Sequence, residues 1–324
     1  MSARPALIDL AKIAVVGALV ALLTPLFFAH RAFHRWRSRR ELPPAVTPIP
    51  SVGLDERSLA DIIDGDEPVI VTGLVEALTL ARTPDVSGLR AMASDHPERF
   101  PVKVHKDHSP YFLYVGDYGA ELDRVEEHDL ASFLDAMFVD GPADGECTYR
   151  LFSTRDLNGE VGTIVDELAT ALEAHTGRRA ERDASGLWIG STGVTTPLHH
   201  DAWTGILFQF EGSKDVVMYG PDDRPNLYFT SPYAATDRWS TLPGRSRDAG
   251  DADYPDLARA QRWEGRLEAG DALFIPAFWA HEVEALEANI SIPFRFATRP
   301  SDYANPGFLR PAYEILHGKL AATR

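Results

Sequence analysis

A His-x-Asp pair and a third histidine about eighty residues later constrain the fold of this chain more than any other feature. His199 and Asp201 flank His200, and His281 follows the apolar run Phe274–Ala280. Side chains at positions i and i+2 of an extended strand point to the same face, so His199 and Asp201 can aim at one point while His200 points away. A third group at that point must come from another strand. The pattern therefore predicts β-structure in which distant strands converge.

The three converging groups are two imidazoles and one carboxylate. This is the ligand set of the facial triad that holds non-haem Fe(II) and leaves coordination positions open. The same mixture of nitrogen and oxygen donors suits Mn(II) or Zn(II) better than Cu(I). Most His-x-Asp tripeptides are surface or hydrogen-bonded residues, so the pair needs supporting motifs. We take His199, Asp201 and His281 as candidate metal ligands and catalytic residues.

Five sequence blocks around these residues resemble the JmjC and cupin-like 2-oxoglutarate oxygenases, especially the factor-inhibiting-HIF type. The blocks are Glu67–Gly73, Val194–Asp201, Phe208–Lys214, Val217–Pro221 and Gly270–Val283. Together they extend the resemblance over roughly residues 60–298. The resemblance implies a mainly β fold with flanking helices, in which the strands form a double-stranded β-helix of the jelly-roll, cupin/JmjC kind.

The resemblance also implies roles for individual residues. His199, Asp201 and His281 match the iron ligands of the family. Lys214 matches the lysine that pairs with the distal carboxylate of 2-oxoglutarate, and Thr196 matches a threonine whose hydroxyl binds the same carboxylate. These residue types suit the ligand, because an ammonium is a compact positive charge and a hydroxyl completes the hydrogen bonds of a carboxylate.

Four more positions concern the wall of the site. On a looser alignment, Tyr149 matches a tyrosine that binds the same carboxylate. The chain departs from its close relatives at Gly205 and Pro293, where they place asparagine. Arg295 stands where an aromatic residue is common, and the period of two puts it on the same face as Pro293. We expect that face to be the barrel interior. Arg295 is then an anchor for the cosubstrate or for an acidic substrate; the alternative is an exposed arginine at a strand end.

The function that the resemblance implies is an oxygenase that uses Fe(II), 2-oxoglutarate and O2 to hydroxylate a protein side chain or a small molecule. Two alternatives remain open. One is a different metal-dependent cupin enzyme, against which Lys214 and Thr196 argue, because such a reaction needs no anchor for 2-oxoglutarate. The other is a non-catalytic cupin that binds 2-oxoglutarate or a peptide, against which the complete triad argues.

The first forty residues differ from the rest of the chain. The run Ile13–Ala29 contains no charge, and five arginines follow it within residues 31–40. As an α-helix this run reaches about 25 Å, slightly short of a hydrocarbon core near 30 Å. Because positive flanks prefer the cytoplasm, we expect a single-pass membrane anchor with the catalytic domain on the cytoplasmic side. A cleaved signal peptide and a buried helix are the alternatives. The expected divisions are an anchor at 1–40, a proline-rich linker at 41–58 and a catalytic domain at 59–324.

The charge of the chain bears on its partners. The whole chain carries a formal net charge of −16, and residues 1–40 carry seven basic residues and one acidic residue, hence +6. Residues 41–324 therefore carry −22. Such an acidic domain is unlike a nucleic-acid-binding protein, so we expect no nucleic acid and instead a basic peptide or protein, or a small molecule. A single cysteine, Cys147, excludes an internal disulfide.

Local patterns predict further elements. Apolar spacing indicates helices near residues 55–64, 128–139, 161–175 and 303–319, the last of which could support a homodimer. Short apolar runs indicate strands near residues 69–71, 102–105, 111–114, 187–189, 271–276 and 281–285. The polar segment 237–262 is expected to form a loop region over the mouth of the barrel.

Overall fold

The computed structural model describes residues 46–105, 124–143, 146–230, 238–242, 245–249 and 252–296, together with five isolated positions between residues 18 and 29. The strands are β1 (Thr47–Pro48), β2 (Ser51–Val52), β3 (Val69–Val71), β4 (Phe100–His105), β5 (Arg124–His128), β6 (Cys147–Ser153), β7 (Gly186–Gly190), β8 (Thr195–His200), β9 (Thr204–Glu211), β10 (Lys214–Tyr219), β11 (Arg262–Leu267), β12 (Ala272–Ile275), β13 (Ala280–Ala285) and β14 (Asn289–Phe296).

The helices with α-helical geometry are α2 (Leu59–Ile63), α3 (Leu74–Ala77), α4 (Val86–Met92), α5 (Leu130–Asp135) and α6 (Glu160–Thr176). The 3-10 helices are η1 (Ala93–Asp95), η4 (Leu157–Gly159), η5 (Arg182–Ala184), η6 (Pro221–Asn226), η7 (Ser246–Asp248) and η8 (Leu257–Arg259). A π-helix, η3 (Ala136–Asp140), continues α5.

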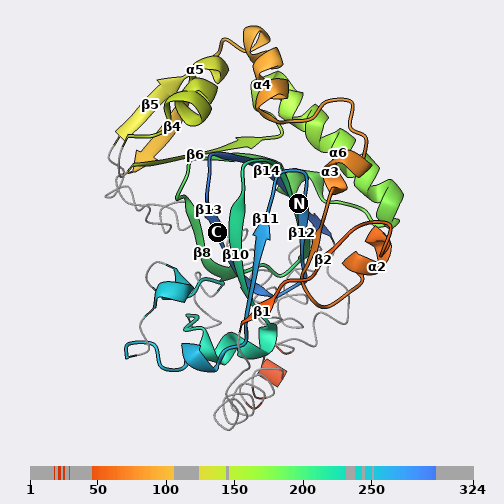
Figure 1. Ribbon diagram of the computed structural model, residues 1–324, viewed down its shortest axis with the longest axis vertical. Helices are drawn as coiled ribbons and strands as arrows, with labels where there is room; N and C mark the ends of the chain where they lie inside the picture. Colours follow the sequence, from red (N-terminus) through yellow and green to blue (C-terminus); the bar gives the residue numbers. More distant parts are fainter. Residues whose placement is uncertain are drawn as a thin grey trace, which may run out of the picture.

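The strands form two sheets that face each other, with helices outside (Figure 1). The smaller sheet has five strands in the order β1-β11-β10-β13-β8. The larger sheet has nine strands in the order β2-β3-β12-β9-β14-β7-β6-β4-β5. This mainly β, jelly-roll-like architecture with flanking helices confirms the fold class that the sequence predicts.

The side chains of the last core strand, β14, alternate between the two faces of the larger sheet. In β14, the buried residues Ile290, Ile292, Phe294 and Phe296 belong to the same hydrophobic cluster as the apolar face of α6. The alternate positions Pro293 and Arg295 line the pocket between the sheets. The expected orientation of this strand is therefore confirmed, since a period of two places one set against the helices and the other in the interior.

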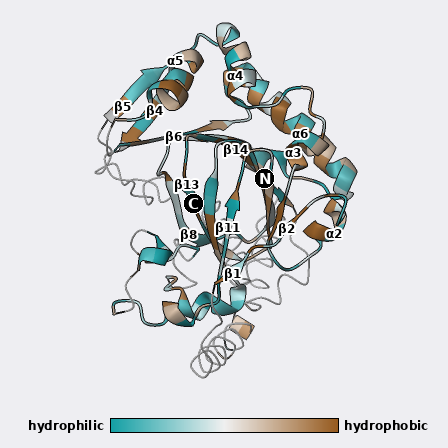
Figure 2. Ribbon diagram, viewed as in Figure 1, coloured by the Kyte–Doolittle hydropathy of each residue, from teal (hydrophilic) through white to brown (hydrophobic). Residues whose placement is uncertain are grey.

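Helix α6 covers the outer face of the larger sheet. Its apolar residues recur at helical spacing, and hydrophobic and hydrophilic positions recur in turn along it in Figure 2. The helix ends at Gly177, whose φ of 65° is left-handed and whose N–H donates to the carbonyl of Glu173 at 2.8 Å. Glycine adopts this conformation without the steric cost of a Cβ atom. The prediction of a helix at 161–175 is confirmed.

Part of the predicted proline-rich linker lies in the sheets. β1 pairs with β11, and β2 pairs with β3, both in parallel register. Ile49, between the two short strands, is 5% exposed and packs in the cluster between the sheets. Residues 47–52 of the expected linker at 41–58 thus take part in both sheets, because their backbone groups complete two sheet edges and Ile49 fills the interior.

The predicted membrane anchor is not supported. Within the described part of the chain, no helix is long and apolar enough to cross a membrane. The uncharged run Ile13–Ala29, on which the prediction rests, lies for the most part outside the described residues. The prediction of a single-pass membrane protein with a cytoplasmic catalytic domain is therefore wrong. Most of residues 1–40, the predicted strand at 111–114 and the predicted helix at 303–319 lie outside the described residues.

Candidate functional site

The three candidate ligands meet where β8 and β13 pair. His199 and His281 lie directly opposite each other in antiparallel register, and their ring centroids are 4.2 Å apart. Asp201 follows β8, and its backbone carbonyl accepts a hydrogen bond of 2.8 Å from Phe278 N, in the turn before β13. One donor atom from each of the three ligands lies within 4.8 Å of the other two. His200 points away, as predicted, and its ring packs 5.3 Å from that of Phe229.

The two imidazoles present the same nitrogen to the centre. Nδ1 of His199 lies 2.8 Å from the carbonyl oxygen of Pro197, and Nδ1 of His281 lies 3.0 Å from that of Trp279. A carbonyl oxygen only accepts, so each Nδ1 donates and each Nε2 keeps its lone pair. A hydrogen bond from the nitrogen that does not face the metal is the usual way in which a metal-binding histidine is oriented. The donor set therefore fits a divalent metal ion.

The protonation states also suit metal binding. Burial lowers the pKa of His199 to about 3, and burial lowers the pKa of His281 as well, so both rings are neutral at pH 7. Burial alone raises the pKa of Asp201, but Arg295 and the two histidines lower it further, so the pKa lies below its usual value. Two neutral imidazoles and one carboxylate are ready to bind a metal ion without first losing protons.

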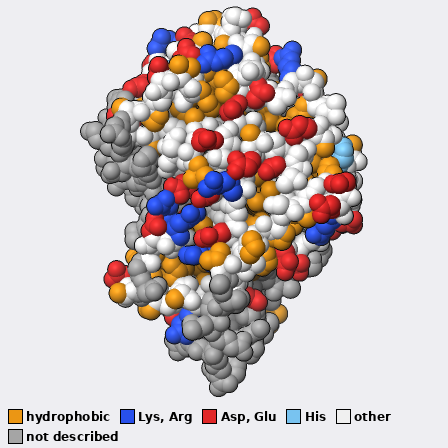
Figure 3. Space-filling model, viewed as in Figure 1, with side chains coloured by type: hydrophobic (Ala, Val, Ile, Leu, Met, Phe, Trp, Pro, Cys, Tyr) orange, Lys and Arg blue, Asp and Glu red, His pale blue; other side chains and the backbone are white. Residues whose placement is uncertain are grey.

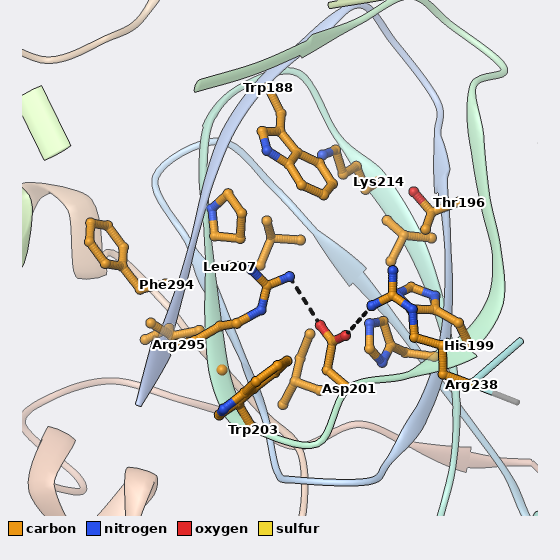
Figure 4. Close-up of a pocket in the computed structure, with 16 residues that line it drawn as sticks. Trp188, Thr196, His199, Asp201, Trp203, Leu207, Lys214, Arg238, Phe294 and Arg295 are labelled. Carbon is orange, nitrogen blue, oxygen red and sulfur yellow. Dashed lines mark hydrogen bonds and ion pairs between the residues drawn. The ribbon is translucent and has the colours of Figure 1, made fainter. Parts of the chain in front are cut away.

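Two arginines hold the carboxylate of Asp201. Nη1 of Arg238 lies 3.0 Å from Oδ1, and Nη2 of Arg295 lies 3.2 Å from Oδ2 (Figure 4). Arg295 comes from β14, and its Nη1 also donates to the carbonyl oxygen of Ala184 at 2.9 Å. The predicted interior position of Arg295 is confirmed, and the alternative of an exposed arginine at a strand end is not what the structure shows.

Lys214 is buried at the other end of the same pocket. It begins β10, is 7% exposed, and its Nζ donates to Ser291 Oγ at 2.7 Å. Burial lowers its pKa to about 7, and no carboxylate among the described residues offsets this effect. Thr196 and Trp188 lie beside it (Figure 4). A buried cation whose partner is a neutral hydroxyl is suited to receive an anionic ligand.

The pocket lies between the two sheets and is lined by side chains from both. The lining residues are Trp188, Thr196, His199, Asp201, Trp203, Gly205, Ile206, Leu207, Lys214, Arg238, Ile275, His281, Val283, Pro293, Phe294 and Arg295. The lining is largely apolar with a few convergent polar groups, as in most small-molecule sites.

The remaining predicted positions are placed differently. Gly205 and Pro293 line the pocket, so the two departures from the family lie on its wall. Tyr149 is half-buried in β6 and packs edge to face on Trp188, with ring centroids 5.9 Å apart. It stands behind this wall and is not itself a lining residue, so its predicted contact with 2-oxoglutarate stays a prediction.

Three residues at the site were not predicted from the sequence. Arg238 and Trp239 belong to the polar segment 237–262, which was expected only to lie over the mouth, and Trp239 stacks on His199 with ring centroids 4.4 Å apart. Trp203 follows the first ligand pair and is 40% exposed at the pocket. The one available signal was the adjacency of arginine and tryptophan in a segment without periodicity, and that signal is weak.

Comparisons with known proteins agree with this geometry. Residues 55–302 match the family described as the cupin-like domain. The chain is 36% identical to tRNA wybutosine-synthesizing protein 5 of Danio rerio over 114 residues, which are 35% of this chain and 33% of that protein. It is 36% identical to HSPB1-associated protein 1 of Homo sapiens over 105 residues, which are 32% of this chain and 21% of that protein.

These matches thus span about a third of the first relative and about a fifth of the second. They do not test the expected likeness to the factor-inhibiting-HIF type, which stays a prediction. The family match, by contrast, covers well over half of the chain and includes every candidate ligand. The chain belongs to the cupin-like domain family.

Proposed function

We propose that this protein is an Fe(II)- and 2-oxoglutarate-dependent oxygenase that hydroxylates a small molecule or a protein side chain. One observation carries the proposal: the triad of His199, Asp201 and His281 shares its pocket with the buried cation of Lys214. A metal site alone is compatible with many cupin reactions. A buried lysine in the same pocket adds a place for an anionic cosubstrate.

Each residue then has a distinct task. Nε2 of His199, Nε2 of His281 and one oxygen of Asp201 would hold the metal ion. Lys214 would bind the distal carboxylate of 2-oxoglutarate, and the hydroxyl of Thr196 would donate a further hydrogen bond to it. Bound Fe(II) would supply the activation of O2, which converts 2-oxoglutarate to succinate and CO2 and inserts the other oxygen atom into a substrate C–H bond.

The protein's own contribution is orientation and exclusion of water. The carbonyls of Pro197 and Trp279 fix both imidazole rings, so that the metal geometry is set before the ion binds. The apolar wall of the pocket, with Ile206, Leu207 and Val283, keeps the reacting atoms dry. Arg295 lies on the facing sheet, and its ion pair with Asp201 orients that carboxylate.

A nucleoside of tRNA is a second candidate substrate, and similarity to tRNA wybutosine-synthesizing protein 5 favours it. The net charge of −22 over residues 41–324 opposes it, because such a domain repels a phosphate backbone. We therefore rank it below a small molecule or a protein side chain. Succinate production measured with and without added bulk tRNA tests the tRNA nucleoside as a substrate.

The proposal is tested with the full chain. Anaerobic calorimetry should show that 2-oxoglutarate binds only when Fe(II) or Mn(II) is present, and under air Fe(II) should support succinate formation. Asp201→Ala should weaken metal-dependent binding at least a hundredfold, because one of three ligands is lost. Asp215→Ala is the matched control, since Asp215 also pairs with two arginines, Arg247 and Arg266, but does not line the pocket.

The outcomes separate the alternatives. Metal binding without any binding of 2-oxoglutarate would favour a different metal-dependent cupin enzyme. Metal-dependent binding of 2-oxoglutarate without succinate above the Asp201→Ala level would favour a non-catalytic protein. Either result contradicts the proposed oxygenase.

A further inference from the structure

Two guanidinium groups share one carboxylate at the metal centre. Arg238 and Arg295 approach Asp201 from different segments and contact different oxygens, at 3.0 and 3.2 Å. Among the residues that the structure describes, no other carboxylate lies within 4.0 Å of either guanidinium. The one negative charge of Asp201 is thus shared by two guanidinium groups, even before a metal ion binds to the same carboxylate.

The charges of the loaded pocket do not balance. Among the described residues, the charged side chains of its lining are Asp201, Lys214, Arg238 and Arg295, which together carry +2. The imidazoles add nothing, because histidine binds a metal in its neutral form. A divalent metal ion adds two positive charges and dianionic 2-oxoglutarate cancels them, so the loaded pocket still carries +2. This excess is local, because the whole chain carries −16.

The excess charge lies on the two sides of Asp201. Figure 4 shows Lys214 and Trp188 at one end, Trp203 at the other, and Asp201 between the two arginines. The proposed function matches Lys214 with the cosubstrate, so the unmatched charge belongs to Arg238 and Arg295. Their side chains are 31% and 23% exposed, so they are partly buried yet accessible from the pocket. Leaving such charges unmatched is costly, and an anion would relieve that cost.

An aromatic wall lies beside Arg295. Trp203 is 40% exposed, and its ring lies 5.9 Å from the guanidinium carbon of Arg295. An exposed tryptophan beside the guanidinium of Arg295 offers a surface for a flat or apolar group next to a binding place for an oxyanion. A guanidinium fork matches the two oxygens of a carboxylate or phosphate in a way that a neutral group cannot.

We propose that Arg238 and Arg295 bind an anionic group of the substrate, a carboxylate or a phosphate, and place the body of the molecule against Trp203. The substrate class is thus an organic acid or a phosphate ester, oxidised at a carbon near its anionic group. This inference rests on the proposed oxygenase function and deepens it. It also assigns Arg295 to the substrate and not to 2-oxoglutarate.

The test uses the full chain loaded with Co(II) in place of Fe(II) and saturated with 2-oxoglutarate, so that binding is measured without turnover. Benzoate, phenyl phosphate and benzamide share one ring and differ in the attached group. Calorimetry should show at least one of the two anions binding ten times more tightly than benzamide. The tighter of the two anions identifies whether the pocket prefers a carboxylate or a phosphate.

Variants then assign the effect to the arginines. Arg238→Met and Arg295→Met, saturated with Co(II), should each weaken binding of that anion at least fivefold and by a larger factor than they weaken binding of 2-oxoglutarate. Arg295→Lys keeps the charge and loses the fork, so its affinity should fall between those of the wild type and Arg295→Met. Arg247→Met is the control, because Arg247 pairs with Asp215 and does not line the pocket. Retained Co(II) binding shows that each variant is folded.

Two results would overturn the inference. Equal affinity for benzamide and both anions would show that the pocket has no anion site. Loss of 2-oxoglutarate binding in the arginine variants, to the same degree as loss of benzoate or phenyl phosphate, would assign the arginines to the cosubstrate. Failure of the wild-type chain to bind 2-oxoglutarate is a separate result, seen before any anion is added, and contradicts the oxygenase proposal itself.

Discussion

The buried charge of Lys214 favours binding of an anionic ligand but lowers the stability of the unloaded folded protein. The side chain is 7% exposed, its one described hydrogen bond goes to the hydroxyl of Ser291, and burial lowers its pKa to about 7. An unfolded lysine has a pKa near 10.4, so below that value the folded protein binds the proton less readily than the unfolded chain does. The unloaded protein therefore bears a cost that an anionic ligand removes.

The first prediction concerns this cost. Lys214→Met should raise the free energy of unfolding of the unloaded protein by on the order of 1–3 kcal/mol at pH 6–7. The reason is that methionine has a volume similar to that of lysine but places no charge in the buried position. The gain should be largest below pH 7, should shrink as the pH rises from about 7 to about 10, and should be absent above that. Urea unfolding at pH 6, 8 and 9.5 measures it.

The matched control is Lys103→Met, because Lys103 is an exposed lysine on strand β4. It should show no gain that depends on pH. The Lys214→Met variant should at the same time lose metal-dependent binding of 2-oxoglutarate. A variant that is less stable than the wild type at pH 6 would contradict the proposed cost of the buried lysine.

At the residue scale, the sequence predicted the three candidate ligands but not the residues that surround them. His199 and Asp201 could be found from the strand period, and all three residues lie in blocks that resemble the family. The contact between Arg238 and Asp201 could not, because it joins a segment without periodicity to a strand end 37 residues earlier. No local rule relates two such positions, so the contact appears only once the chain is folded.

At the element scale, the best predictions were those with a strong period. Helix α6 and strand β14 were placed correctly because buried apolar residues repeat along them at 3.6 and 2 residues. The two-residue strands β1 and β2 were missed, because two residues carry no period and the prolines around them favour a linker. Their pairing is decided by the edges of the sheets and not by their own sequence.

The second prediction uses two glycines with nearly the same backbone. Gly177 ends α6 with φ of 65°, and Gly212 lies in the turn between β9 and β10 with φ of 66°. A Cβ at Gly177 meets nothing within 4 Å, whereas one at Gly212 would lie 2.3 Å from the carbonyl oxygen of Ala288. Gly177→Ala should cost about 1 kcal/mol of stability, and Gly212→Ala at least about 2 kcal/mol more.

The turn at Gly212 precedes Lys214 by two residues, so the two variants should also differ in function. Gly212→Ala should weaken binding of 2-oxoglutarate severalfold, because the turn must shift away from the backbone of Ala288. Gly177→Ala, far from the pocket, should leave the affinity unchanged. Thermal unfolding and calorimetry on the same samples make the comparison, and equal costs at the two positions would contradict the role of the clash.

At the scale of the whole molecule, the pocket and the surface have opposite charge. Acidic side chains are spread over the face seen in Figure 3, with basic side chains between them. The chain carries −16, whereas the charged side chains that line the pocket in the described part of the chain carry +2. An anionic ligand is thus repelled by the molecule at long range and attracted by the site at short range. Which of the two governs capture depends on distance and on screening by salt.

The third prediction follows from that difference in range. The Debye length falls from about 30 Å at 0.01 M salt to about 8 Å at 0.15 M, so added salt removes distant repulsion before it weakens close attraction. The association rate of 2-oxoglutarate with the Mn(II)-loaded protein should therefore rise severalfold between 10 and 150 mM NaCl. Stopped-flow tryptophan fluorescence can follow it, because Trp188 lines the pocket.

Pyruvate provides the control, because it carries one negative charge where 2-oxoglutarate carries two. Its association rate should rise about half as steeply on a logarithmic scale, since repulsion by the whole molecule scales with the charge of the ligand. A rate that falls with salt for both ligands would mean that the positive pocket already governs the approach at long range. The acidic surface would then affect solubility and leave ligand capture unchanged.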